Sequence, residues 1–114
     1  MLTLKHRFHG HNSLRFLYQK GRAVYAPKTK LLWLPAKPDT YRVAIVVSKK
    51  VHKSAVVRNR IRRRIYEQVR LYAKAQQINA DMIIIVQDDH LATAGSEIVS
   101  AEVGQLLKKI SASA

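Results

Sequence analysis

The stretch KKVHKSAVVRNRIRRRIYEQVR, Lys49–Arg70, combines an apolar pattern typical of a buried helix with a very high density of positive charge. It holds nine of the chain's 21 lysines and arginines and a single acid. At 100° per residue, four apolar side chains in and just beyond this stretch fall within about 80° of one another: Ile61, Ile65, Val69 and Tyr72. We therefore predict an amphipathic helix that packs on the protein with one face and presents an almost purely cationic face outward.

Two aliphatic, β-branched runs flank this helix. The run YRVAIVVS, Tyr41–Ser48, precedes it and the run DMIIIVQ, Asp81–Gln87, follows it. Both are typical of buried strands. Ser54 is the predicted N-cap, the helix is expected to continue to about Gln76, and Asn79 is a suitable stop. The order predicts a strand–helix–strand unit.

The first third of the chain adds a helix and two strands. Asn12 or Ser13 is predicted to cap a short helix through LRFLYQK, and Gly21 is predicted to end it in a left-handed conformation. One strand is expected at Arg22–Ala26 and another within TKLLWLPAKP, Thr29–Pro38, where prolines mark a turn.

A last helix is predicted to open at Ser96, because apolar residues then recur at helical spacing: Val99, Val103, Leu106 and Ile110. Gly104 inside this helix costs about 1 kcal/mol relative to alanine, so we expect it to mark close packing. The order of elements is α-β-β-β-α-β-α. It predicts an α+β fold in which a single sheet of about four strands packs against helices.

Composition points to one domain with a polyanionic partner. The chain has 114 residues, 21 Lys and Arg against 7 Asp and Glu, a formal net charge of +14 and an isoelectric point near 10.6. Such an excess attracts nucleic acid before an anionic membrane or an acidic protein. We expect a single RNA-binding domain over residues 1–114, with residues 1–10 and 111–114 flexible.

The absence of cysteine excludes disulfides and thiolate-bound metal, and it fits a cytoplasmic location. The longest aliphatic run, Met82–Val86, is too short to span a bilayer. The amino-terminal residues MLTLKHRFHG lack the continuous apolar segment of a signal peptide. We therefore expect a soluble protein that does not bind membranes.

The cationic face has two interpretations, a solvated surface and a nucleic-acid contact. Solvated faces usually mix signs, whereas here arginines four apart, such as Arg58 and Arg62, repel each other. Arginine also favours forked contacts with phosphate, so we favour nucleic acid. There is no second helix placed for a helix-turn-helix. The segments RVAIVVS and MIIIVQ of the two strands carry no aromatic residues on which bases could stack as they do in an RRM.

The order of motifs resembles the bacterial ribonuclease P protein subunit. In that family, as in VSKK followed by AVVRNRIRRRIYE here, an Arg-Asn-Arg helix comes after a strand that ends in Ser-Lys-Lys. The short helix ending YQKG, the strand DMIIIVQ and the terminal helix agree, so the resemblance covers about residues 4 to 110. It implies a ribosomal-protein-S5-like fold with an unusual left-handed βαβ crossover.

The resemblance also implies a function. The chain would be the noncatalytic protein subunit of an endoribonuclease whose RNA subunit, using Mg²⁺, removes the 5′ leader of precursor tRNA. The implied partners are ribonuclease P RNA and precursor tRNA, with no obligate protein partner and no cofactor bound by the protein alone. A structural RNA-binding protein of ribosomal type, without a role in cleavage, is the alternative.

Site residues follow from the resemblance by position. Contact with the ribozyme RNA is expected from the polar face of the basic helix and the residue before its cap: Lys53, Arg58, Asn59, Arg60, Arg62, Arg63 and Arg64. Contact with the leader is expected from the first helix and the end of the central strand: Leu14, Phe16, Tyr18, Lys49 and Lys50. The chain departs from the family pattern at Leu14, where the family has an aromatic residue, and at Tyr66, where many members have a basic one.

We predict no catalytic and no metal-binding residues in the protein. Two groups of potential ligands exist, but neither has a recognised metal-ligand spacing: His6, His9 and His11, and Asp88, Asp89 and His90. A protein-only nuclease would need clustered carboxylates, and the seven acids are scattered.

Overall fold

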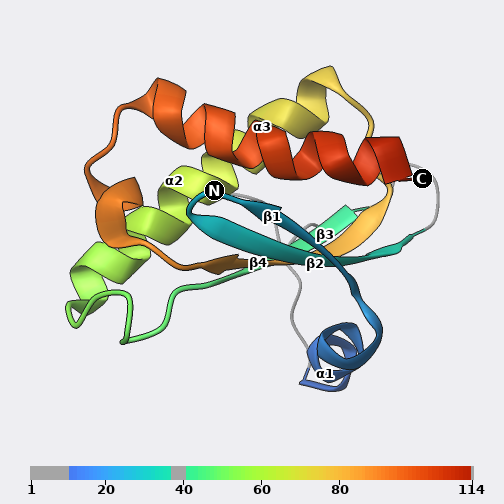
Figure 1. The fold of residues 1–114 in the computed structure, drawn as a ribbon, viewed down its shortest axis with the longest axis horizontal. Helices are drawn as coiled ribbons and strands as arrows, with labels where there is room; N and C mark the ends of the chain where they lie inside the picture. Colours follow the sequence, from blue (N-terminus) through green and yellow to red (C-terminus); the bar gives the residue numbers. More distant parts are fainter. Residues whose placement is uncertain (1–10, 37–40, 114) are drawn as a thin grey trace.

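The computed structural model describes residues 11–36 and 41–113, with the backbone alone for residues 11–13 and 111–113. A four-stranded sheet lies between a short helix on one face and two long helices on the other (Figure 1). The predicted α+β class and element order are confirmed, with the addition of a short 3₁₀ helix, η1. The expected flexibility of the chain ends stays a prediction, because residues 1–10 and 114 lie outside the described residues and the backbone of 111–113 continues the last helix.

The sheet has the strand order β1-β2-β4-β3, so the last strand in sequence lies in the middle. Antiparallel pairing joins β1 to β2 and β2 to β4, while β3 and β4 are parallel. Their bounds are β1 Arg22–Ala26, β2 Thr29–Pro35, β3 Tyr41–Val46 and β4 Ala80–Val86. Helix α2 forms the crossover between the two parallel strands, and its left-handedness stays a prediction.

Helix α2, Ala55–Ala75, begins where the sequence predicts. The Ser54 backbone is extended, and its hydroxyl accepts a hydrogen bond from the Val57 amide at 3.3 Å, which confirms the N-cap. The predicted apolar stripe packs on the sheet: Ile61, Ile65 and Val69 are buried, and Tyr72 is partly buried.

Helix α1, His11–Lys20, departs from its predicted ends. It begins at His11, so the predicted caps Asn12 and Ser13 are wrong and lie inside the helix. Gly21 is not in the left-handed conformation predicted for it. Glycine is required there for a different reason: a Cβ would lie 2.5 Å from the carbonyl oxygen of Leu17, to which the Gly21 amide donates a hydrogen bond at 2.8 Å.

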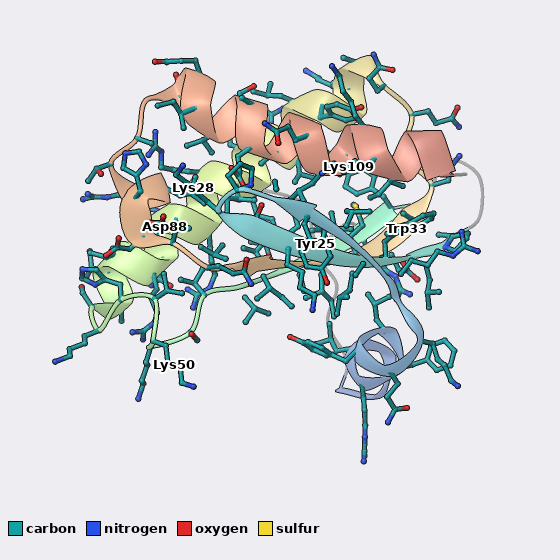
Figure 2. The ribbon with its side chains drawn as sticks, in the orientation of Figure 1. Tyr25, Lys28, Trp33, Lys50, Asp88 and Lys109 are labelled. Carbon is teal, nitrogen blue, oxygen red and sulfur yellow. The ribbon has the colours of Figure 1, made fainter. Side chains whose placement is uncertain are left out.

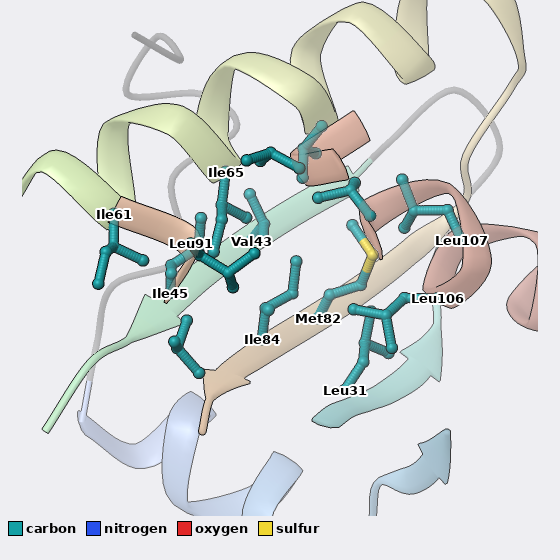
Figure 3. Packing of buried hydrophobic residues seen from close by; sticks show 14 of the residues in the cluster. Leu31, Val43, Ile45, Ile61, Ile65, Met82, Ile84, Leu91, Leu106 and Leu107 are labelled. Atoms are coloured by element: carbon teal, nitrogen blue, oxygen red, sulfur yellow. The ribbon is translucent and has the colours of Figure 1, made fainter. Parts of the chain in front are cut away.

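Helix α3, Ser96–Ser113, lies beside α2 on the same face of the sheet, and the two helices and η1, Asp89–Ala92, enclose the main core (Figure 3). All four apolar residues predicted for the inner face of α3 are buried. The expected close packing at Gly104 is wrong, because a Cβ there would meet no atom within 4 Å. The core is built by the following side chains, among others: Leu31, Val43, Ile45, Ile61, Ile65, Met82, Ile84, Leu91, Leu106 and Leu107.

A smaller apolar cluster joins α1 to the opposite face of the sheet. Leu17 of α1 is buried against Leu32 of β2 and Ile83 of β4. Successive residues of a strand point to opposite faces, so β2 and β4 supply side chains to both clusters. Within the described residues, no helix has the length and apolarity that a membrane crossing requires.

Candidate nucleic-acid interface

The outer face of α2 carries cations that the protein leaves unpaired. Arg60 and Arg63 are exposed, and neither makes a hydrogen bond or ion pair within the described part of the chain. With Arg64, Glu67, Gln68 and the first turn of α3, they line a groove of about 340 Å³. Arg60 and Arg63 can therefore meet an anion there without giving up a bond to another described residue, although Glu67 places one carboxylate in the same groove.

Two further polar side chains of α2 are joined by a hydrogen bond within the helix. Asn59 is exposed, and its Oδ1 accepts from the guanidinium group of Arg62, three residues later on the helix. Because this contact already restrains both side chains, they would lose less rotamer freedom on binding RNA than unrestrained side chains would. The predicted contact residues Asn59 and Arg62 therefore lie together at the surface.

Two of the predicted RNA contacts, Arg58 and Arg64, instead donate to backbone carbonyls of the protein. Arg58 Nη1 donates to the carbonyl oxygens of His52 at 3.0 Å and Lys53 at 2.8 Å, which fastens the segment before α2 to the helix. Lys53 itself is exposed.

Arg64 is half-buried, and its Nη1 donates to the carbonyl oxygen of Leu91 at 2.7 Å. Its Nη2 donates to the carbonyl oxygen of Ala94. These two bonds tie η1 and the residues after it to α2. No local pattern could have signalled this role, because the acceptors lie 27 and 30 residues further along the chain.

Acidic side chains compensate little of this charge. Within the described residues, the structure has two ion pairs, Arg42–Asp81 and Arg70–Glu67. Arg42 Nε and Nη2 each donate to a carboxylate oxygen of Asp81 at 2.9 Å, and this hydrogen bonding raises the pKa of Arg42. The hydrogen bond from Arg70 lowers the pKa of Glu67. The one acid of the basic stretch thus neutralises the arginine at its end. The cations of the first half of α2 have no acidic partner among residues 11–36 and 41–113.

The α1 face presents aromatic side chains. Phe16 is 56% exposed and Tyr18 is 49% exposed, while Leu14 is partly buried beside the cluster around Leu17. Leu14 and Tyr18 also line a shallow hollow with Arg15 and Gln19. Tyr18 can therefore offer its ring to a base, and Leu14 can offer only an apolar edge.

Lys49 and Lys50 are exposed in the turn after β3, which the Val51 amide closes by donating to the Ser48 carbonyl oxygen at 3.1 Å. Lys50 points to the same side of the sheet as α1 (Figure 2). The predicted leader contacts therefore border one face of the sheet, with α1 at one end and lysines at the other.

The two groups of potential metal ligands, which we predict bind no metal, are described only in part. Asp88 Oδ1 accepts from the His90 amide at 2.8 Å and so caps η1. His6 and His9 lie outside the described residues, and His11 is described by its backbone only. Among the side chains that the structure describes, no three His, Cys, Asp or Glu residues converge in a metal-binding arrangement.

Comparisons with known proteins identify the family of the chain. The chain is 28% identical to the ribonuclease P protein component of a Synechococcus species, over 96% of this chain and 95% of that protein. It is 39% identical to that of Desulforapulum autotrophicum, over 82% of this chain and 79% of that protein.

Solved structures give the same result. The fold is similar to the RNase P protein from Staphylococcus aureus, with a TM-score of 0.78 and 25% identity over 92% of this chain and 94% of that one. It also resembles the fold of the RNase P protein from Thermotoga maritima, with a TM-score of 0.79 and 20% identity over 90% of this chain and 96% of that one. The family model described as Ribonuclease P matches residues 2–111. With its Arg-Asn-Arg helix set behind a strand that leads into Ser-Lys-Lys, the chain belongs to the ribonuclease P protein family.

Proposed function

We propose that this chain is the cytoplasmic protein subunit of ribonuclease P, which assists a catalytic RNA in removing the 5′ leader of precursor tRNA. The observation that carries the proposal is the separation of two surfaces. Free arginines lie on the outer face of α2, and exposed aromatic residues lie on α1 across the sheet. The first surface suits structured RNA, and the second suits an unpaired strand.

The ribozyme RNA would bind the outer face of α2. Arg60 and Arg63 would contact phosphates directly, because their guanidinium groups bond to no residue in the part of the chain that the structure describes. The Asn59–Arg62 pair would add contacts of fixed geometry, and Lys53 would extend the surface toward the start of the helix.

Arg58 and Arg64 have a different part in this proposal. They fasten the segment before α2 and the η1 region to the helix, so they shape the surface that the free arginines present. Neither guanidinium could bind a phosphate with its full set of donors without loosening these carbonyl contacts.

The precursor leader would bind the α1 face. Tyr18 and Phe16 are exposed and can stack on bases, and each such contact is worth roughly 1–3 kcal/mol. Leu14 would contact the strand by its apolar side chain. Lys49 and Lys50 would neutralise backbone phosphates at the other end of this face.

The protein would supply binding rather than bond cleavage. The RNA subunit, with Mg²⁺, would supply the chemistry. The protein's free cations reduce repulsion between two polyanions, the ribozyme and its substrate. The complex should therefore need less Mg²⁺ than the RNA alone.

The test is cleavage of precursor tRNA at low Mg²⁺ by a bacterial ribonuclease P RNA, with and without the purified protein. We expect no cleavage by the protein alone and strong stimulation of the RNA. Cleavage by nuclease-free protein in the absence of RNA would contradict the proposal. Binding to the RNA without any stimulation would favour the structural RNA-binding alternative.

Substitution separates the two surfaces. Tyr18→Ala should weaken the preference of the holoenzyme for precursor over mature tRNA and leave ribozyme RNA binding unchanged. Fluorescence titration of the holoenzyme with each tRNA measures this preference. An unchanged preference in a folded Tyr18→Ala protein would show that Tyr18 does not contact the leader.

A further inference from the structure

A third exposed aromatic residue is not among the residues predicted to contact either RNA. Among the described residues, three aromatic side chains are largely exposed: Phe16, Tyr18 and Tyr25. Tyr25 is 56% exposed and lies on β1, the edge strand beside α3 (Figure 2). The side chain is not among those packed against either apolar cluster.

The register of the sheet places Tyr25 on the α1 face. Residues directly opposite each other on neighbouring strands share a face. Tyr25 pairs with Lys30, Lys30 with Ile85, and Ile85 with Val46. This row of four side chains is adjacent to the row that contains Leu32 and Ile83, on which α1 packs.

The row joins Tyr25 to the predicted leader surface. It spans three strand spacings, roughly 14 Å in all, from β1 to β3. The turn that carries Lys49 and Lys50 follows β3 closely. Lys30, Ile85 and Val46 are half-buried, so side chains of the sheet form a continuous floor between these lysines and Tyr25.

The surroundings of the Tyr25 ring are cationic. The Lys30 ammonium lies 5.6 Å from the ring centroid. The Lys109 ammonium, from α3, donates to the carbonyl oxygen of Tyr25. Glu102 of α3 is buried, where it accepts from the Thr29 hydroxyl at 2.6 Å and the Lys28 amide at 2.9 Å, so its charge is not presented at the surface.

An exposed aromatic ring with one lysine over it and a second at its backbone carbonyl, beside a row of half-buried side chains, has the elements of a platform for single-stranded nucleic acid. We propose that Tyr25 stacks on an unpaired base of the precursor leader, upstream of the nucleotides held beside Tyr18. The leader would then cross the strands along the row described above. Lys30 would stay over one ring face while the base covers the other, and Lys109 would meet the adjoining phosphate. This inference rests on the proposed function.

The experiment uses the reconstituted holoenzyme and precursor tRNAs whose leaders are lengthened one nucleotide at a time. The affinity of the wild-type holoenzyme for precursor tRNA should rise once as the leader reaches Tyr18 and a second time when the leader is long enough to reach Tyr25. Tyr25→Ala should remove that second rise, about a 5- to 150-fold loss for one stacked base. Tyr25→Phe should retain it, because the ring is kept. Thermal melts of the free proteins check that each variant is folded.

The outcomes are distinguishable. If wild-type holoenzyme does not prefer precursor to mature tRNA, the proposed function itself fails. If it does, and Tyr25→Ala matches wild type at every leader length, the Tyr25 platform is overturned while the proposed function stands. If Tyr25→Ala weakens binding of the ribozyme RNA and spares the leader dependence, the assignment to the leader is overturned.

Discussion

Arg64 should stabilise the free protein although it belongs to the most basic run of the chain. Its two hydrogen bonds to the carbonyl oxygens of Leu91 and Ala94 are made by a charged donor, and such bonds contribute about 1.5–3 kcal/mol each. Because the side chain is half-buried, we take the lower part of that range and expect Arg64→Met to lower the free energy of unfolding by about 3–4 kcal/mol. Relief of repulsion with Arg60 returns only a few tenths of a kcal/mol.

Urea denaturation of the free protein measures this loss as a lower midpoint at unchanged slope. Arg63→Met is the matched control, since it removes the same charge from an exposed site and should change stability by less than about 0.5 kcal/mol. In ribozyme RNA binding we expect the opposite ranking, with the larger effect from Arg63→Met. Arg63→Met should reduce the salt dependence of ribozyme RNA binding, whereas Arg64→Met should not.

Equal stability of the two variants would refute the structural role of Arg64. A folded Arg64→Met protein with a reduced salt slope would show that Arg64 leaves its carbonyl partners and contacts RNA.

Three further predictions concern other parts of the molecule. The double variant Arg60→Ala, Arg63→Ala should lower the slope of log K against log salt by about 1.4–1.8, in titrations with the ribozyme RNA. Burial raises the pKa of Tyr41 above its usual 10.0. The stability gained from the neutral phenol therefore holds below pH 10.0 and is lost as the pH rises through the raised pKa. Thermal melts at alkaline pH should show this loss of stability in the wild-type protein and less of it in Tyr41→Phe. Gly104→Ala should raise the free energy of unfolding by about 0.5–1 kcal/mol, measured by urea denaturation, because the site has room for a Cβ and lies inside a helix.

The elements that could be predicted from the sequence are those whose signals are local. The stripe of α2 and its Ser54 cap depend on residues a few positions apart, and both were confirmed. The predicted strand at Arg22–Ala26 has the observed bounds. The strand predicted within Thr29–Pro38 is observed as Thr29–Pro35, and it ends at the first of the prolines predicted to mark a turn.

Features that depend on distant partners were missed. Nothing near β4 indicates that it inserts between β2 and β3, because that order is decided by which aliphatic faces meet. The role of Arg64 is set by carbonyl groups of a later loop. The exposure of Tyr25 follows from its place on an edge strand, which alternation alone does not reveal.

The layering of the fold has an electrostatic consequence. Helix α2 and the sheet separate the outer arginines from the α1 face, and the helix alone is about 10–12 Å across. At physiological ionic strength the Debye length is about 8 Å, so phosphates held on the two sides would hardly repel each other. The layers of the fold therefore hold two strands of like charge further apart than one Debye length, and substitutions on one side should add to those on the other within about 0.5 kcal/mol.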